Sequence, residues 1–145
     1  KPVHKKISEV SDKILKLKPK FNFLKLERDY IAFKGDTWPY GLQYQIITRT
    51  RSKLYHVALT GEIKKGQDVS YIMSELNKIK TIFEKSVPDV EWEIDEWYPG
   101  RLKCKNRIVT FVDINDSEKA VDIYLKIIDA SQSLLNEIVS SKKTE

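Results

Sequence analysis

Three carboxylates recur at every second position near the middle of the chain: Glu91, Glu93 and Asp95. On an extended strand they would share one face at a spacing of about 7 Å, and clustered carboxylates are ligands for hard cations. The segment that follows carries basic residues with the same period of two, namely Arg101, Lys103, Lys105 and Arg107. The two runs flank Tyr98-Pro99-Gly100, so the pattern predicts a β-hairpin whose strands carry opposite charges.

Pairing across this hairpin decides between a metal site and a structural role. A turn centred on Pro99 would place every acid opposite a base, in the pairs Asp95–Lys103, Glu93–Lys105 and Glu91–Arg107. Such pairs stabilise an antiparallel ladder by about 0.2–1 kcal/mol each. We therefore expect a cross-strand charge ladder and no metal site here. A two-residue turn at Pro99-Gly100 would turn the bases to the wrong face, so we expect a bulge or a three-residue connection near Gly100.

Two basic segments are candidates for binding a polyanion. Residues 1–20 contain seven lysines and two acidic residues, which gives +5, the net charge of the whole chain. The other segment is the tip of a predicted hairpin at residues 49–53. The candidate nucleic-acid-binding residues are Lys5, Lys6, Lys13, Lys16, Arg49, Arg51 and Lys53. Solvated side chains that bind nothing are the alternative reading of both segments.

Trp38 lies in a segment, residues 35–41, that its glycines and proline mark as a loop. Its ring could stack on a nucleic-acid base, and Trp97 is a second candidate for that role. The alternative is that Trp38 closes the hydrophobic core as a lid. We favour the lid, because a large aromatic side chain is costly to leave in water.

A catalytic reading rests on the tripeptide Glu62-Ile63-Lys64. It resembles the E-x-K element of the PD-(D/E)xK nucleases, in which the carboxylate binds a metal and the lysine is catalytic. The family also needs an acid at the head of the preceding strand, and the nearest one here is Asp36, which makes a divalent-metal-dependent nuclease the weaker alternative. The two histidines, His4 and His56, are too far apart in sequence for metal-ligand spacing. No catalytic triad and no glycine-rich phosphate loop are present.

Hydrophobic periodicity predicts the elements in the order α-β-β-β-β-α-β-β-α. Apolar residues at helical spacing (Val3, Ile7, Val10, Ile14, Leu17) predict a helix that ends before Pro19. Strands are expected at 21–26, 30–34, 42–48 and 54–60. A helix should run from an Asp68 cap to Ser86, and a capping box at Asn115 and Glu118 should open the last one. Residues 140–145 should form a frayed tail.

The inner face of the central hairpin follows from strand alternation. Leu42, Tyr44 and Ile46 should point into the core, as should Tyr55, Val57 and Leu59, which leaves His56 on the opposite face. Short turns between successive strands favour an antiparallel arrangement. We therefore predict an α+β fold, a mostly antiparallel sheet of about six strands with helices packed on one face.

Length and composition indicate a single domain spanning residues 1–145. Of these residues 32% are charged and 41% hydrophobic, which is typical of a globular protein. No run approaches 18 apolar residues, and the single Cys104 cannot form an intramolecular disulfide. We expect a cytoplasmic location. Because the chain begins at Lys1 and its only methionine is Met73, we also expect it to be a piece of a longer or processed protein.

From Tyr44 to Ile138 the order of parts resembles an uncharacterised C-terminal domain of bacterial restriction-type and nuclease-associated proteins. The resembling pieces are Leu54-Tyr55-His56-Val57, Glu75-Leu76-Asn77-Lys78-Ile79-Lys80, Val90-Glu91-Trp92-Glu93, Arg107-Ile108 and the long closing helix. They cover about two-thirds of the chain. The resemblance implies an accessory role beside a nucleic-acid-processing module of restriction-modification type, and it assigns no functional residue.

Three functions are therefore expected in order of preference. The first is a non-catalytic accessory or interaction domain, whose partners are other domains of the same protein or a separate protein. The second is direct DNA or RNA binding by the basic segments, and the third is the nuclease with Glu62 and Lys64. No cofactor and no membrane partner are expected in any of them.

Overall fold

The computed structural model describes residues 2–63, 74–100 and 103–144, and the side chains of 2–61, 74–96 and 106–141. The elements follow the predicted order. They are α1 (Lys5–Leu17), β1 (Lys25–Leu26), β2 (Tyr30–Phe33), β3 (Gln43–Arg49), β4 (Leu54–Ile63), α3 (Leu76–Ser86), β5 (Glu93–Gly100), β6 (Lys103–Asp113) and α4 (Ser117–Thr144).

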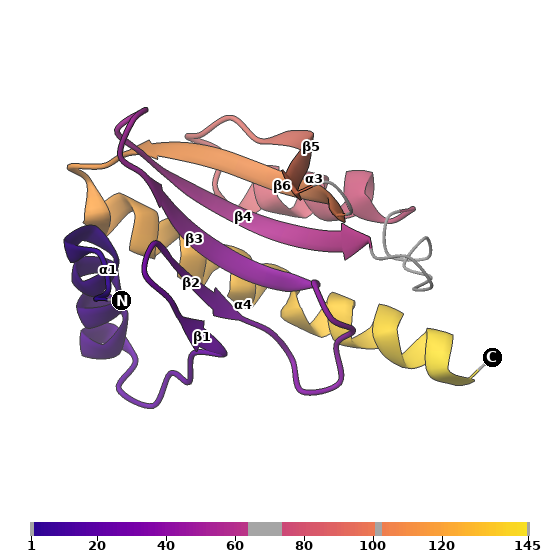
Figure 1. The fold of residues 1–145 in the computed structure, drawn as a ribbon. Coiled ribbons are helices and arrows are strands. Elements are labelled where there is room, and N and C mark those ends of the chain that lie inside the picture. Colours follow the sequence, from indigo (N-terminus) through magenta and orange to yellow (C-terminus); the bar gives the residue numbers. More distant parts are fainter. Residues whose placement is uncertain (1, 64–73, 101–102, 145) are drawn as a thin grey trace.

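The strands form one six-stranded sheet in the order β1-β2-β3-β4-β6-β5, and every neighbouring pair is antiparallel. The helices of the described residues lie behind this twisted sheet, with α4 crossing most of its width (Figure 1). The predicted α+β class and the two-layer arrangement are confirmed. One face of the sheet is therefore covered by helices, and no helix of the described residues covers the other.

The covered face holds the hydrophobic core. All six side chains predicted to point inward from the central hairpin are at most 2% exposed. Two buried tyrosines are satisfied there: the Tyr44 hydroxyl lies 2.7 Å from Ser131 Oγ, and the Tyr124 hydroxyl donates to the Tyr44 carbonyl at 3.1 Å. Burial raises the pKa of both hydroxyls, so they stay protonated and uncharged.

α1 packs through the apolar stripe that the sequence predicts. Ile7, Val10 and Ile14 are fully buried, whereas Leu17 is 66% exposed, so the stripe stops one turn early. The helix ends at Leu17, as expected from Pro19. At its start the His4 ring caps the helix, because Nδ1 accepts the Lys6 N–H at 3.0 Å.

Two predicted helix ends are wrong, and a third cannot be compared because the Asp68 cap lies outside the described residues. The described part of the predicted helix is interrupted by a turn at Ser74 and Glu75, and α3 begins at Leu76. α4 is capped by Asp116, whose Oδ1 accepts the Lys119 N–H at 3.2 Å, and not by Asn115. The tail expected to fray from Ser140 is helical to Thr144. Val139 is 2% exposed, and its packing stabilises the helix near this end.

The β5–β6 hairpin has a different register from the predicted one. Asp95 faces Arg107 and Glu93 faces Val109, so each pairing is shifted by four residues. The segment Tyr98-Pro99-Gly100 belongs to β5 and is not the turn. The expected irregularity is confirmed, since the register shifts between Trp97 and Gly100.

An aromatic contact holds the residue that precedes β5 against α3. Trp92 is 6% exposed and packs edge-on against Phe83 of α3 with 5.0 Å between ring centroids. Burying such a ring contributes several times more than an exposed ion pair. A shift by four keeps Asp95 and Arg107 on their predicted face, and among the described side chains of the predicted ladder these two form an ion pair.

Candidate nucleic-acid interface

A pocket of about 410 Å³ lies where three segments meet at one end of the sheet. The segments are the start of α1, the β1–β2 turn and the tip of the β3–β4 hairpin. Its lining contains four residues with basic side chains among seven, and we call it the basic pocket. The lining residues are His4, Arg28, Asp29, Thr48, Arg49, Thr50 and Arg51.

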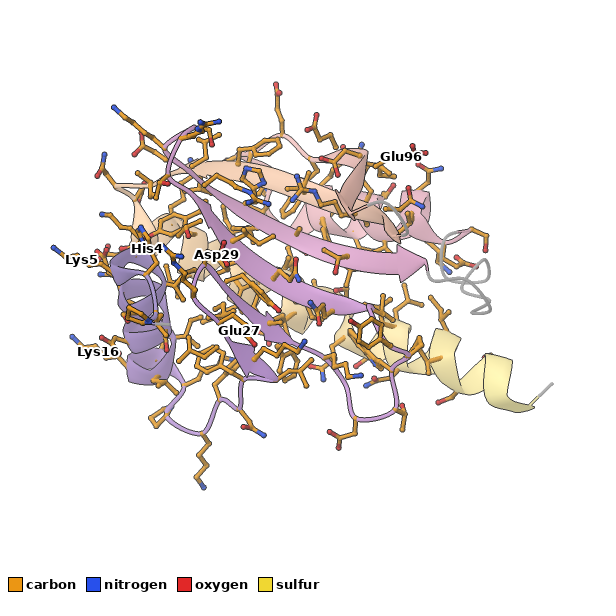
Figure 2. The ribbon with its side chains drawn as sticks, in the orientation of Figure 1. His4, Lys5, Lys16, Glu27, Asp29 and Glu96 are labelled. Carbon is orange, nitrogen blue, oxygen red and sulfur yellow. The ribbon has the colours of Figure 1, made fainter. Side chains whose placement is uncertain are left out.

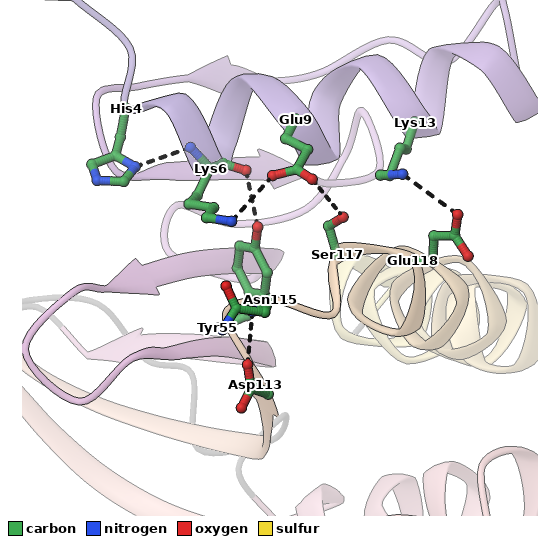
Figure 3. A network of polar contacts seen from close by, with 9 residues as sticks. All are labelled: His4, Lys6, Glu9, Lys13, Tyr55, Asp113, Asn115, Ser117 and Glu118. Carbon is green, nitrogen blue, oxygen red and sulfur yellow. Dashed lines mark hydrogen bonds and ion pairs between the residues drawn. The ribbon is translucent and has the colours of Figure 1, made fainter.

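Backbone hydrogen bonds hold these segments against each other. The His4 N–H donates to the Arg28 carbonyl at 2.6 Å, which ties the start of α1 to the β1–β2 turn. The Thr48 N–H donates to the Asp29 carbonyl at 2.8 Å, and its hydroxyl donates to the same oxygen at 3.2 Å. The Tyr55 hydroxyl donates to the Lys6 carbonyl at 3.2 Å and anchors α1 on the sheet (Figure 3). The pocket walls are therefore fixed by main-chain contacts.

The hairpin tip has a defined conformation. Lys53 adopts a left-handed φ of 57°, which closes the turn, and its N–H donates to the Thr50 carbonyl at 3.3 Å. The Lys53 carbonyl accepts the Ile114 N–H at 3.0 Å, which joins the tip to the segment after β6. These contacts present Arg51 to solvent beside the pocket.

His4 can donate to a bound anion. Because Nδ1 accepts the Lys6 N–H, a neutral ring carries its proton on Nε2. No acidic residue occupies the first turn of α1. The positive end of the helix dipole is therefore not neutralised by a carboxylate of its own first turn.

The arginines give the pocket a positive charge. Arg28, Arg49 and Arg51 supply three charges and Asp29 removes one, so the lining sums to +2 before any proton on His4. Arg28 and Arg51 are exposed. Within the described part of the chain, no carboxylate lies within 4.0 Å of either guanidinium. The planar guanidinium fork matches the oxygens of a phosphate.

The lysines of α1 are placed differently from these arginines. Lys6 pairs with Glu9 at 3.5 Å and Lys13 with Glu118 at 3.6 Å (Figure 3). Lys5 and Lys16 extend from α1 away from the sheet (Figure 2). Of the seven predicted basic residues, only Arg49 and Arg51 line the basic pocket, since Lys53 lies beyond its lining. His4 and Arg28 join them, and no local sequence signal marked either one.

Trp38 is not an exposed stacking platform. Its side chain is 3% exposed and its Nε1–H donates to Asn136 Oδ1 at 2.7 Å. A Cβ at Gly35 would lie 2.4 Å from that nitrogen, so glycine is required for the ring to seat. No ring face is left for a base, and the expected lid is confirmed. The Trp97 side chain lies outside the described residues.

A second pocket of about 590 Å³ borders the same loop and α4. Its two charged residues, Lys34 and Asp36, are of opposite sign, and the Lys34 ammonium donates to the Trp38 carbonyl at 3.1 Å. The amides of Asn22, Gln132 and Asn136 complete a neutral polar lining. Because its charges balance, this pocket offers a polyanion less attraction than the basic pocket.

The residues of the nuclease reading lie outside the described side chains. Only the backbone of Glu62 is placed, opposite Lys105, and Lys64 is not described. In the described part of the chain, no three His, Cys, Asp or Glu residues are grouped closely enough to hold a metal ion. Asp95 accepts two hydrogen bonds from Arg107, at 2.8 and 3.1 Å, which gives that acid a structural partner.

His56 lies on the helix-free face, as expected. Burial, helped by the nearby charges of Arg107 and Arg49, lowers the pKa of His56 to about 4. Its ring packs against the Phe111 ring in a T-shaped arrangement, with 4.7 Å between the ring centroids. His56 is therefore neutral near pH 7 and adds no positive charge to the nearby pocket.

None of the helices in the described ranges has both the length and the apolar composition of a membrane span.

Comparison with known proteins adds no family assignment. The sequence matches no protein-family model and no curated protein.

Proposed function

We propose that this chain is a non-catalytic nucleic-acid-binding domain that holds phosphate groups at the basic pocket. One observation carries the proposal: Arg28 and Arg51 come from different turns, converge on one cavity and, among the described residues, have no carboxylate within 4.0 Å. Exposed arginines with this placement gain more from a phosphate than from water, because the bonds formed are charge-assisted and bidentate. The domain would serve as an accessory module of a nucleic-acid-processing protein.

The expected binding is modest and independent of sequence. The three arginines of the lining neutralise about two or three phosphate charges, and phosphate contacts carry no base information. The logarithm of the association constant should then fall with the logarithm of the salt concentration with a slope of about −2. An affinity in the micromolar range at about 50 mM salt is expected.

Fluorescence anisotropy with a labelled 12-nucleotide single strand, in DNA and RNA forms, tests the proposal. The variant Arg28→Ala/Arg51→Ala should lose about tenfold in affinity at 50 mM salt and should show a shallower salt slope. A matched control is Lys78→Ala/Lys85→Ala on α3, which removes the same charge from exposed positions. It should change the affinity less than twofold.

Two outcomes would contradict the proposal. One is that the unmodified protein binds neither DNA nor RNA at about 50 mM salt, where electrostatic binding is strong. The other is that the α3 control loses as much affinity as the pocket variant, since binding would then follow net charge and not the pocket. Circular dichroism of each variant checks that the fold is retained.

A further inference from the structure

We infer that the basic pocket takes a terminal phosphate monoester of a nucleic-acid strand in preference to an internal phosphodiester. The inference rests on the proposed function and specifies the group that this pocket recognises. Three features carry it: the size of the pocket, its charge and the donor-bearing residues that line it.

The first feature is size. The His4–Arg28 and Thr48–Asp29 backbone bonds join the three segments that line the pocket. Its volume of about 410 Å³ is at the small end of ligand pockets and suits one nucleotide. An internal phosphodiester brings a continuing strand on both sides, which needs a groove open at two ends. A strand terminus enters such a pocket with only one continuing side.

The second feature is charge. The three arginines and Asp29 sum to +2. A phosphate monoester carries a charge of about −1.5 to −2 near pH 7, whereas an internal diester carries one negative charge. Coulomb attraction scales with the product of the charges, so the dianion gains up to about twice as much.

The third feature is the set of donors around the cavity. Three residues whose side chains carry hydrogen-bond donors line the cavity from different segments: Arg28 and Arg51 from two turns, and His4 from the start of α1. Donors from three directions match the three terminal oxygens of a monoester. A diester has only two non-bridging oxygens, so at least one of these directions would be left without an acceptor.

The test uses three 12-nucleotide single strands of one sequence, labelled at an internal base. They carry a 5′-phosphate, a 3′-phosphate or hydroxyls at both ends. Anisotropy at about 50 mM salt should show at least one phosphorylated strand binding about tenfold more tightly than the hydroxyl-ended strand. In Arg28→Ala/Arg51→Ala this ratio should fall to within twofold of one, while Lys78→Ala/Lys85→Ala should retain it.

The possible results separate this inference from the proposed function. Equal affinity for all three strands, lost in the pocket variant, would overturn the preference and leave phosphate-backbone binding in place. A preference that survives in the pocket variant would place the terminal phosphate elsewhere and overturn the inference. Absence of binding to any strand would overturn both. Competition by uridine 5′-monophosphate, with little competition by uridine at the same concentration, would support the inference independently of strand length.

Discussion

Arg107 and two arginines of the basic pocket, Arg28 and Arg51, lie in opposite surroundings. Arg107 is 4% exposed and meets both carboxylate oxygens of Asp95. Arg28 and Arg51 are exposed and, in the described ranges, lie near no carboxylate at ion-pair distance. The difference teaches that an arginine with a bidentate carboxylate contributes to folding, whereas one without it is available to a ligand. Stability and binding should therefore respond to different arginines.

The largest expected effect is on folding. Arg107→Ala leaves Asp95 without its bidentate partner and opens space under β5, so it should lower the free energy of unfolding by about 2–3 kcal/mol. Urea denaturation measures the change. Asp95→Asn is the milder control, because the amide oxygen can still accept a hydrogen bond, and a loss of about 1 kcal/mol is expected. A loss below about 0.5 kcal/mol in Arg107→Ala would show that the pair is not structural.

Charge reversal in the pocket should affect binding alone. Arg51→Glu replaces an attractive charge with a repulsive one beside the phosphate, so affinity for a single strand should fall at least tenfold, about 1.4 kcal/mol. Its side chain is exposed, so the free energy of unfolding should change by less than about 0.5 kcal/mol. Anisotropy and urea denaturation separate the two effects. A variant that unfolds easily but binds normally would reverse the comparison between the two sets of arginines.

The contribution of His56 to the free energy of unfolding should depend on pH. Its pKa of about 4 in the folded state lies below the ordinary value of 6.5, so the unfolded chain binds more protons between these pH values. The His56 contribution is thus constant above pH 6.5 and is lost as pH falls toward 4. For this partly exposed ring the loss should be about 1 kcal/mol after solvent screening.

The matched variant for that prediction is His56→Gln, which cannot titrate. The difference in unfolding free energy between it and the unmodified protein should shrink by about 1 kcal/mol as pH falls from 7 to 4.5. Burial is the main cause of the lowered pKa, and the charged groups that add to or oppose it are Arg107, Arg49 and Asp95. A difference that stays constant with pH would contradict the lowered pKa.

The smallest effect is expected from the α1 lysines. Lys13→Ala removes an exposed pair with Glu118 at 3.6 Å, so the free energy of unfolding should change by less than about 0.5 kcal/mol. Nucleic-acid affinity should change less than twofold, because Lys13 does not line the pocket. A tenfold loss of affinity would move the interface from the pocket to the lysine side of α1.

Local patterns in the sequence determine the elements and their buried faces. Apolar residues alternate along a strand at Leu42, Tyr44 and Ile46, and they recur at helical spacing at Ile7, Val10 and Ile14. Each pattern places its apolar side chains on one face of its element, and that face is buried in the core. Pro19 and Pro88 stop two helices where expected. These features could be read from sequence because backbone geometry fixes the period of each element.

The tertiary structure decided the strand register and the loop positions, which no periodic sequence pattern specifies. Strand alternation assigns each side chain to a face, but the pairing of Asp95 with Arg107 is established only in the assembled sheet. Similarly, Arg28 and Arg51 are distant in sequence and become neighbours through the contacts of His4 and Thr48 with the β1–β2 turn. Asp95, from the carboxylate row that suggested a metal site, forms an ion pair with Arg107, and the candidate site arises where loops meet. Sequence by itself determined the periodic elements, and only tertiary structure could decide the pocket, because loop positions depend on long-range packing.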